Sequence, residues 1–129
     1  MKNFPFITLK QALLLLRIST ALLFLAHAIV RIVNGTLSQF ADFLAAKGFM
    51  MSFPLVWAIT FFEIAGGMAM ILGYFTKWFA FGFILMLLAG IVIIHAEFGW
   101  FVGEHGTGGM EYSVALIFAL VTIAAADRR

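Results

Sequence analysis

The chain has 129 residues, of which 64% are hydrophobic and 11% are charged, and its formal net charge at pH 7 is +2. So few charges exclude an ordinary soluble domain, in which about 25% of residues are charged, and indicate an integral membrane protein. The absence of Cys excludes disulfides, iron–sulfur clusters and thiol chemistry, and the spread of the eight Lys and Arg along the chain excludes a nucleic-acid partner.

Four apolar segments are each about as long as a helix that crosses the ~30 Å hydrocarbon layer of a bilayer. They cover residues 12–33, 54–73, 77–95 and 109–126. The first segment is too long for the apolar part of a secretory signal and has no obvious cleavage motif, so we expect it to be retained as a span. The connection between the second and third segments is short, which makes them antiparallel neighbours. The sequence therefore predicts an all-α membrane protein, a four-transmembrane-helix bundle in which residues 1–129 form a single integral membrane domain.

The basic residues are divided unequally between the two sides of this bundle. One side carries Lys2, Lys10, Lys77, Arg128 and Arg129, and the other carries Lys47 and, at its boundary, Arg31. The positive-inside rule then places both termini in the cytoplasm. Aromatic residues, which gather at membrane interfaces, agree with this orientation: Trp57, Trp100 and Tyr112 fall at the outer boundary, and Tyr74 and Trp78 at the inner one.

The connection between the first and second segments contains "TLSQFADFLAAKGF", residues 36–49. Its apolar residues recur at helical spacing, and Asp42 and Lys47 fall on other faces. This pattern favours a short amphipathic helix along the outer surface over an ordinary loop.

Small residues recur four positions apart in the second segment, at Ala65, Ala69 and Gly73. Such a stripe lets two helices approach closely. We therefore expect this face to pack inside the bundle.

Several ionisable residues lie within or at the ends of the spans, where an ionised side chain costs on the order of 3 kcal/mol unless it is paired or solvated. They are Arg17, His27, Arg31, Glu63, His95 and Glu111. Glu63 lies roughly 14 Å deep, close to the midplane, and His27 lies within ~6 Å of that depth. We therefore predict His27 as the first partner of Glu63 and Arg17 as the second. The distribution predicts a polar cavity in the outer half of the bundle with Glu63 at its floor.

The stretch "HAEFGWFVGEHGTGGMEY", residues 95–112, is the most polar part of the chain. Nitrogen and oxygen ligands for a divalent metal could come from His95, Glu97, Glu104, His105 and Glu111, but no recognised ligand spacing is present. We predict no metal, and we interpret Glu104 and His105 as a solvated loop and His95 and Glu111 as site residues. A metal site, or a haem held by His27 and His95, remains the alternative.

Three stretches resemble the DoxX family of small four-span bacterial membrane proteins, whose relatives include the DoxD-like subunit of thiosulfate:quinone oxidoreductase. "LLRISTALLFLAHAIVRI" is similar to the first span of the family, "FFEIAGGMAMILGYFTKW" to its second-span signature, and "GGMEY" to the start of its last span. The matching positions are Arg17, His27, Glu63, Gly66, Gly67, Gly73, Thr76, His95, Gly109 and Glu111. The chain departs from the family pattern at Ala28, where Gly is usual, at Arg31, where Lys is common, and at its end "AAADRR", where a Gly-Pro-Gly is often seen.

The resemblance implies a membrane subunit of a redox process in the bacterial inner (plasma) membrane, in contact with lipid and with a partner subunit or a second copy of the chain. The outer half-cavity would hold a quinone headgroup or relay protons. The candidate catalytic residues are His27, Glu63, His95 and Glu111, and the candidate cofactor-binding residues are Arg17, Arg31 and Tyr112. Two alternatives stay open: a non-catalytic scaffold or anchor for a partner enzyme, and transport of a small solute or cation.

Overall fold

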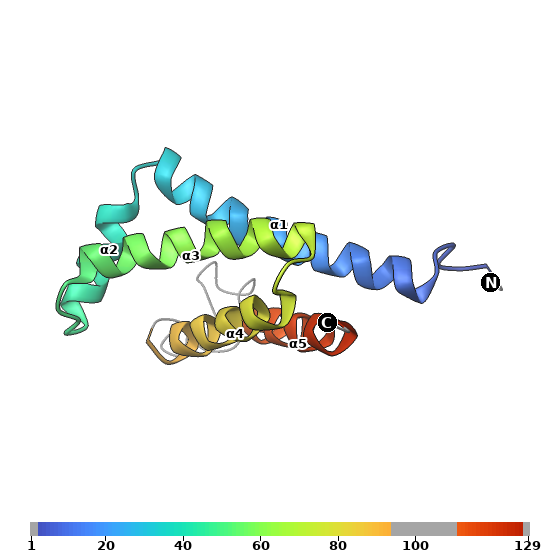
Figure 1. Cartoon of the computed structure of the whole chain (residues 1–129). Coiled ribbons are helices and arrows are strands. Elements are labelled where there is room, and N and C mark those ends of the chain that lie inside the picture. Colours follow the sequence, from blue (N-terminus) through green and yellow to red (C-terminus); the bar gives the residue numbers. More distant parts are fainter. Residues whose placement is uncertain (1–2, 94–110, 128–129) are drawn as a thin grey trace.

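A computed structural model of the chain describes residues 3–93 and 111–127. Within these residues it contains the helices α1 (Leu9–Val33), α2 (Leu37–Ala46), α3 (Ser52–Leu72), α4 (Thr76–Ile93) and α5 (Glu111–Ala126), and no strand (Figure 1). The all-helical prediction is confirmed, and α1, α3, α4 and α5 coincide with the four apolar segments. The helix predicted after the first segment is also present, as α2.

Three of the helices, α1, α3 and α4, are long and apolar enough to cross a membrane, and α5 is a shorter apolar helix. Only 17% to 33% of the residues in the three long spans are buried inside the protein. Large apolar side chains such as Phe61, Phe81 and Phe118 are therefore exposed on the outside of the bundle. An apolar surface of this extent requires lipid around it.

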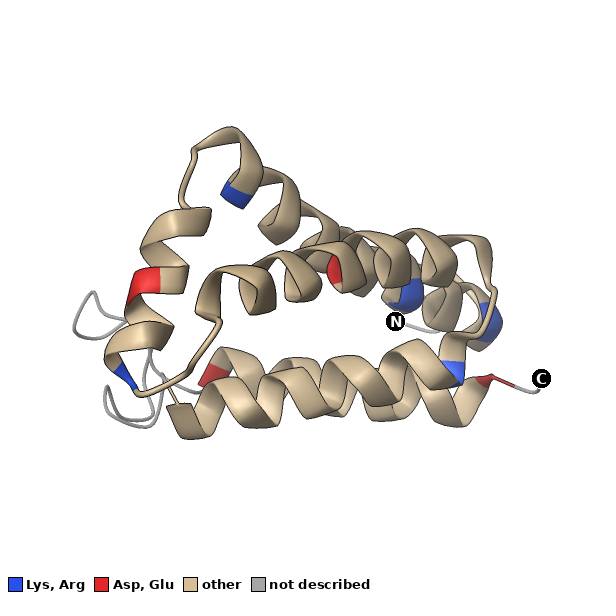
Figure 2. Ribbon diagram, turned by 60° about the vertical axis from the view of Figure 1, so that its left-hand side comes forward, with Lys and Arg blue, Asp and Glu red and all other residues tan. Residues whose placement is uncertain are grey.

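The helices form a closed ring in which α1 packs against α3 and α5, and α4 also packs against α3 and α5. Figure 2 shows α1 and α3 as one pair above α4 and α5, with α2 across one end. Phe24 of α1 and Phe83 of α4 stack at the centre with their ring centroids 4.0 Å apart. Met70 and Leu120, both fully buried, complete the core from α3 and α5.

Two adjacent glycines bring α3 close to α1 and to α4. A Cβ atom on Gly66 would lie 2.8 Å from the Cζ of Phe83 in α4, and one on Gly67 would lie 2.7 Å from the Cγ of Leu25 in α1. The stripe prediction is wrong here, because Ala65 is exposed and Ala69 is only half-buried. A four-residue spacing shows that small residues share one line along a helix, but α3 meets α1 and α4 on two different faces. Adjacent residues are about 100° apart around the helix, so Gly66 and Gly67 can each contact a different neighbouring helix.

The end of α3 depends on the left-handed backbone of Gly73, whose φ is +85°. This left-handed conformation costs an L-residue with a Cβ roughly 1 kcal/mol of free energy, and the cost is smaller for Asn than for Ala. We expect Gly73→Ala to lower the free energy of unfolding by about 1 kcal/mol and Gly73→Asn to lower it by less. Unfolding of both variants by dodecyl sulfate in mixed micelles measures the difference. Equal stability of Gly73→Ala and the unmodified protein would contradict the assignment.

Candidate functional site

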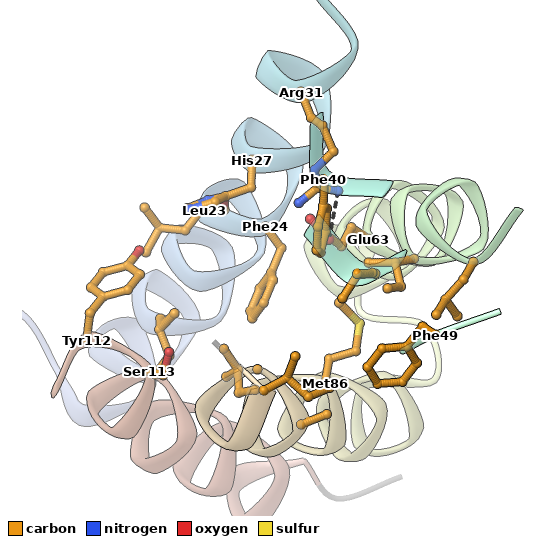
Figure 3. Close-up of a pocket in the computed structure, with 18 residues that line it drawn as sticks. Leu23, Phe24, His27, Arg31, Phe40, Phe49, Glu63, Met86, Tyr112 and Ser113 are labelled. Carbon is orange, nitrogen blue, oxygen red and sulfur yellow. Dashed lines mark hydrogen bonds and ion pairs between the residues drawn. The ribbon is translucent and has the colours of Figure 1, made fainter. Parts of the chain in front are cut away.

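A cavity of about 450 Å³ lies between the two helix pairs at the end of the bundle that α2 crosses (Figure 3). Its volume falls within the range of small-molecule binding sites. Most of its wall is apolar, and all five helices contribute side chains, including Phe24, Leu44, Ile59, Met86 and Leu116. Four of the predicted site residues also line it: His27, Arg31, Glu63 and Tyr112.

Arg31 and Glu63 form an ion pair at the edge of this cavity. The Nη1 of Arg31 lies 3.2 Å from the Oε1 of Glu63, and the two side chains are only 15% and 4% exposed. The same nitrogen donates a hydrogen bond of 3.0 Å to the hydroxyl of Thr60, which in turn donates to the carbonyl of Val56. Arg31, in the last turn of α1, thus ties that helix to the middle of α3. An unpaired charge in an apolar span is costly.

Glu63 is bonded to Arg31 and not to the predicted first partner, His27, which acts on Glu63 only through its electrostatic field. Gly67 packs on Ala21 and Leu25, so His27 and Glu63 lie at the same level of the antiparallel pair α1 and α3. Arg31, one turn later, lies about 40° around α1 from His27. Its longer side chain reaches back along the helix to Glu63, while His27 points toward the side where Tyr112 lies (Figure 3).

His27 is held by its own helix. Its Nδ1 lies 2.9 Å from the carbonyl oxygen of Leu23, and the side chain is exposed at the cavity. Because a carbonyl only accepts, Nδ1 carries the hydrogen, and a neutral His27 leaves Nε2 as an acceptor. The ring is therefore oriented to take a proton or a hydrogen bond from a group in the cavity.

The helix α2 covers the polar edge of the cavity. The guanidinium carbon of Arg31 lies 5.1 Å from the ring centroid of Phe40, a cation–π contact between α1 and α2. Phe40 and Leu44 also line the cavity. Neither Thr60 nor Phe40 was predicted as a site residue. The position of Thr60 one turn before Glu63 could have indicated the former, whereas no pattern places Phe40 over Arg31.

The remaining predicted residues divide into three groups. Tyr112 and the buried Ser113 line the cavity from the first turn of α5, and Glu111 is the half-buried first residue of that helix. Arg17 lies away from the cavity, beside Gly73 at the opposite end of α3, so it does not pair with Glu63. His95, Glu97, Glu104, His105 and Gly109 lie outside the described residues.

In the described ranges, no three His, Asp or Glu side chains gather as metal ligands do. The curated proteins and the solved structures give no match. The sequence model of the DoxX family matches residues 12–96, which cover most of α1 and all of α2, α3 and α4 and carry His27, Arg31 and Glu63. This match covers more than half of the chain, and with three apolar spans it identifies a multi-pass membrane protein: the chain belongs to the DoxX family.

Proposed function

We propose that this protein is a membrane subunit of a redox process in the bacterial inner membrane and that its cavity holds a quinone headgroup. In this proposal α1, α3, α4 and α5 all cross the membrane and both termini face the cytoplasm. Lys10 and Lys77 support the orientation, because they lie at the end of the bundle where both termini lie. Figure 2 shows basic segments at that end and also, at Arg31 and Lys47, at the end that α2 crosses. The 16 residues of α5 span ~24 Å, a shortfall that local thinning of the bilayer accommodates.

The observation that carries the proposal is an apolar cavity with polar groups on two of its sides. A quinone needs apolar walls for its ring and tail and a few hydrogen-bonding groups at its oxygens. Phe24 and Met86 supply walls. His27 and Tyr112 lie on one side and the Arg31–Glu63 pair on the other (Figure 3), so the residues present fit the group.

A bound quinone would supply the exchange of electrons and protons, and the chain would supply proton handling and orientation. His27 offers Nε2 as an acceptor, which suits the hydroxyl of the reduced form. Arg31 uses Nη1 for Thr60 and Glu63 and has further N–H groups that suit a ligand oxygen. Tyr112 can donate or accept, and Glu63 and Glu111 would take up the accompanying protons. The electrons would come from or go to a partner protein.

A second function, a scaffold that anchors a partner enzyme, is favoured by one observation. Arg31 contacts Thr60, Glu63 and Phe40 at once, which joins α1, α2 and α3. A cluster with this connectivity fixes helix packing whether or not a ligand binds. The two functions make different predictions for a cavity residue that makes no contact between helices. Replacing such a residue weakens quinone binding if the cavity holds a quinone, and it has no effect if the protein is only a scaffold.

His27 provides that distinction, because its hydrogen bond stays within α1. We expect His27→Gln to leave unfolding unchanged and to weaken binding of a decyl-substituted benzoquinol about tenfold, the value of one hydrogen bond of ~1.4 kcal/mol. Quenching of tryptophan fluorescence in detergent measures the affinity, and Tyr74→Phe, at the opposite end of the bundle, is the control. Absence of saturable binding, or equal affinity of His27→Gln and the control, would favour the scaffold.

A further inference from the structure

A second cavity, of about 240 Å³, lies at the opposite end of the bundle from the first. It is bounded by α1, by the start of α4 and by the end of α5. Its polar lining residues are Lys10, Arg17, Thr76 and Asp127, and its apolar ones are Leu13, Leu14, Ile123 and Ala126. The proposed quinone cavity shares none of these residues.

Two of the residues that line this cavity carry a buried donor with no acceptor in the described part of the chain. The side chain of Thr76 is 2% exposed, and its Oγ1 is buried without a hydrogen-bond partner. The Nε of Arg17 is also buried and also has no hydrogen-bond partner. Buried polar atoms in native proteins nearly always have a partner, and each exception needs an explanation. Because Nε–H can only donate, the missing group is an acceptor.

The charges around the cavity favour an anion. Lys10 and Arg17 bring two positive charges, and Thr76 is the first residue of α4, where the helix dipole is positive. Asp127 brings one negative charge, and among the described residues it forms no ion pair with Lys10 or Arg17. The cavity therefore combines a net positive charge with two buried donors in need of an acceptor.

We propose that this cavity binds a phosphate group, held between Thr76 and Arg17 with Lys10 at the entrance. The same chemistry is offered by the headgroup of an anionic phospholipid and by free phosphate. Leu13, Leu14 and Ile123, which form the apolar part of the lining, suit the first glycerol and acyl carbons of a lipid. This proposal does not depend on the proposed quinone site, because the two cavities share no lining residue.

The test compares two ligands on delipidated protein in an uncharged maltoside detergent. Dihexanoyl phosphatidylglycerol and inorganic phosphate are titrated separately, and the rise in unfolding temperature gives the affinity. Thr76→Val removes the hydroxyl and keeps the shape of the side chain. Thr122→Val is the matched control, because its hydroxyl is exposed and bonds to the carbonyl of Phe118 in its own helix.

We expect Thr76→Val to weaken binding about tenfold, as for a hydrogen bond to a charged group, and Thr122→Val to leave it unchanged. Without ligand, Thr76→Val should unfold at the same temperature as the unmodified protein or higher, since it deletes a hydroxyl that lacks a partner. Asp127→Asn should strengthen binding, the opposite of the effect of Thr76→Val, because it removes the negative charge from the lining of the cavity. Binding of the lipid alone identifies a headgroup site, and binding of both ligands identifies a phosphate site. Saturation by neither ligand, or equal affinities of Thr76→Val and Thr122→Val, would overturn the proposal.

Discussion

Arg31→Met is expected to lower the free energy of unfolding by about 3 kcal/mol, the lower end of the cost of removing one partner of a buried ion pair. The reason is the position of Glu63, whose side chain is 4% exposed and lies in the middle of α3. Without Arg31 its carboxylate has no guanidinium within reach, and Thr60 loses the donor that now bonds its hydroxyl. Unfolding by dodecyl sulfate in mixed micelles measures the loss.

The double variant Arg31→Met, Glu63→Leu is expected to recover most of that loss. Replacing a buried ion pair by apolar side chains of similar size is often neutral or stabilising, because the cost of keeping two charges away from water disappears with them. Lys77→Met, which removes an exposed charge at the start of α4, is the control and should change stability by less than about 0.5 kcal/mol. A double variant as unstable as Arg31→Met alone would contradict this account, because it would show that the loss does not come from the unpaired carboxylate of Glu63.

Gly67→Leu is expected to cost about 3 kcal/mol as well, for a steric reason. A Cβ atom on Gly67 would lie 2.7 Å from Leu25 Cγ and 3.2 Å from the carbonyl oxygen of Ala21. The side chain of Leu25 can move, but the backbone of α1 cannot move without separating the two helices, so overpacking is costly. The same unfolding measurement applies.

Ala65→Leu is the matched control for this substitution. Ala65 lies two residues earlier on the same helix and is exposed on its outer surface. A leucine there meets lipid, and its expected effect is within about 0.5 kcal/mol. Equal losses for Gly67→Leu and Ala65→Leu would mean that the close approach of α1 and α3 does not contribute to stability.

The extent of each helix was predictable because it depends on local composition. Runs of apolar residues of bilayer length end at polar or glycine positions, and the helices α1, α3, α4 and α5 follow them within a few residues. The helix α2 was predictable for the same reason, from the spacing of its apolar residues. The similar level of Glu63 and His27 along the antiparallel helices α3 and α1 followed from counting residues.

The partners of the buried charges were not predictable from depth alone. They depend on the rotation of each helix about its own axis and on the length of the side chain. As a result, Glu63 pairs with Arg31, and His27 points toward Tyr112. The close contacts of Gly66 and Gly67 with α4 and α1 could not be predicted for a related reason. A spacing pattern on α3 marks several possible faces, and only the positions of α1 and α4 select Gly66 and Gly67.

The most direct test of the proposed function is native mass spectrometry of the protein released from mild detergent, with bound molecules identified by their mass. We expect one quinone-sized molecule per chain in the unmodified protein and a clearly lower occupancy in His27→Gln. Phospholipid adducts are a separate matter, because the site at Thr76 would account for them. A protein that carries no quinone, and only lipid or a partner polypeptide, would contradict the proposed redox role of the cavity.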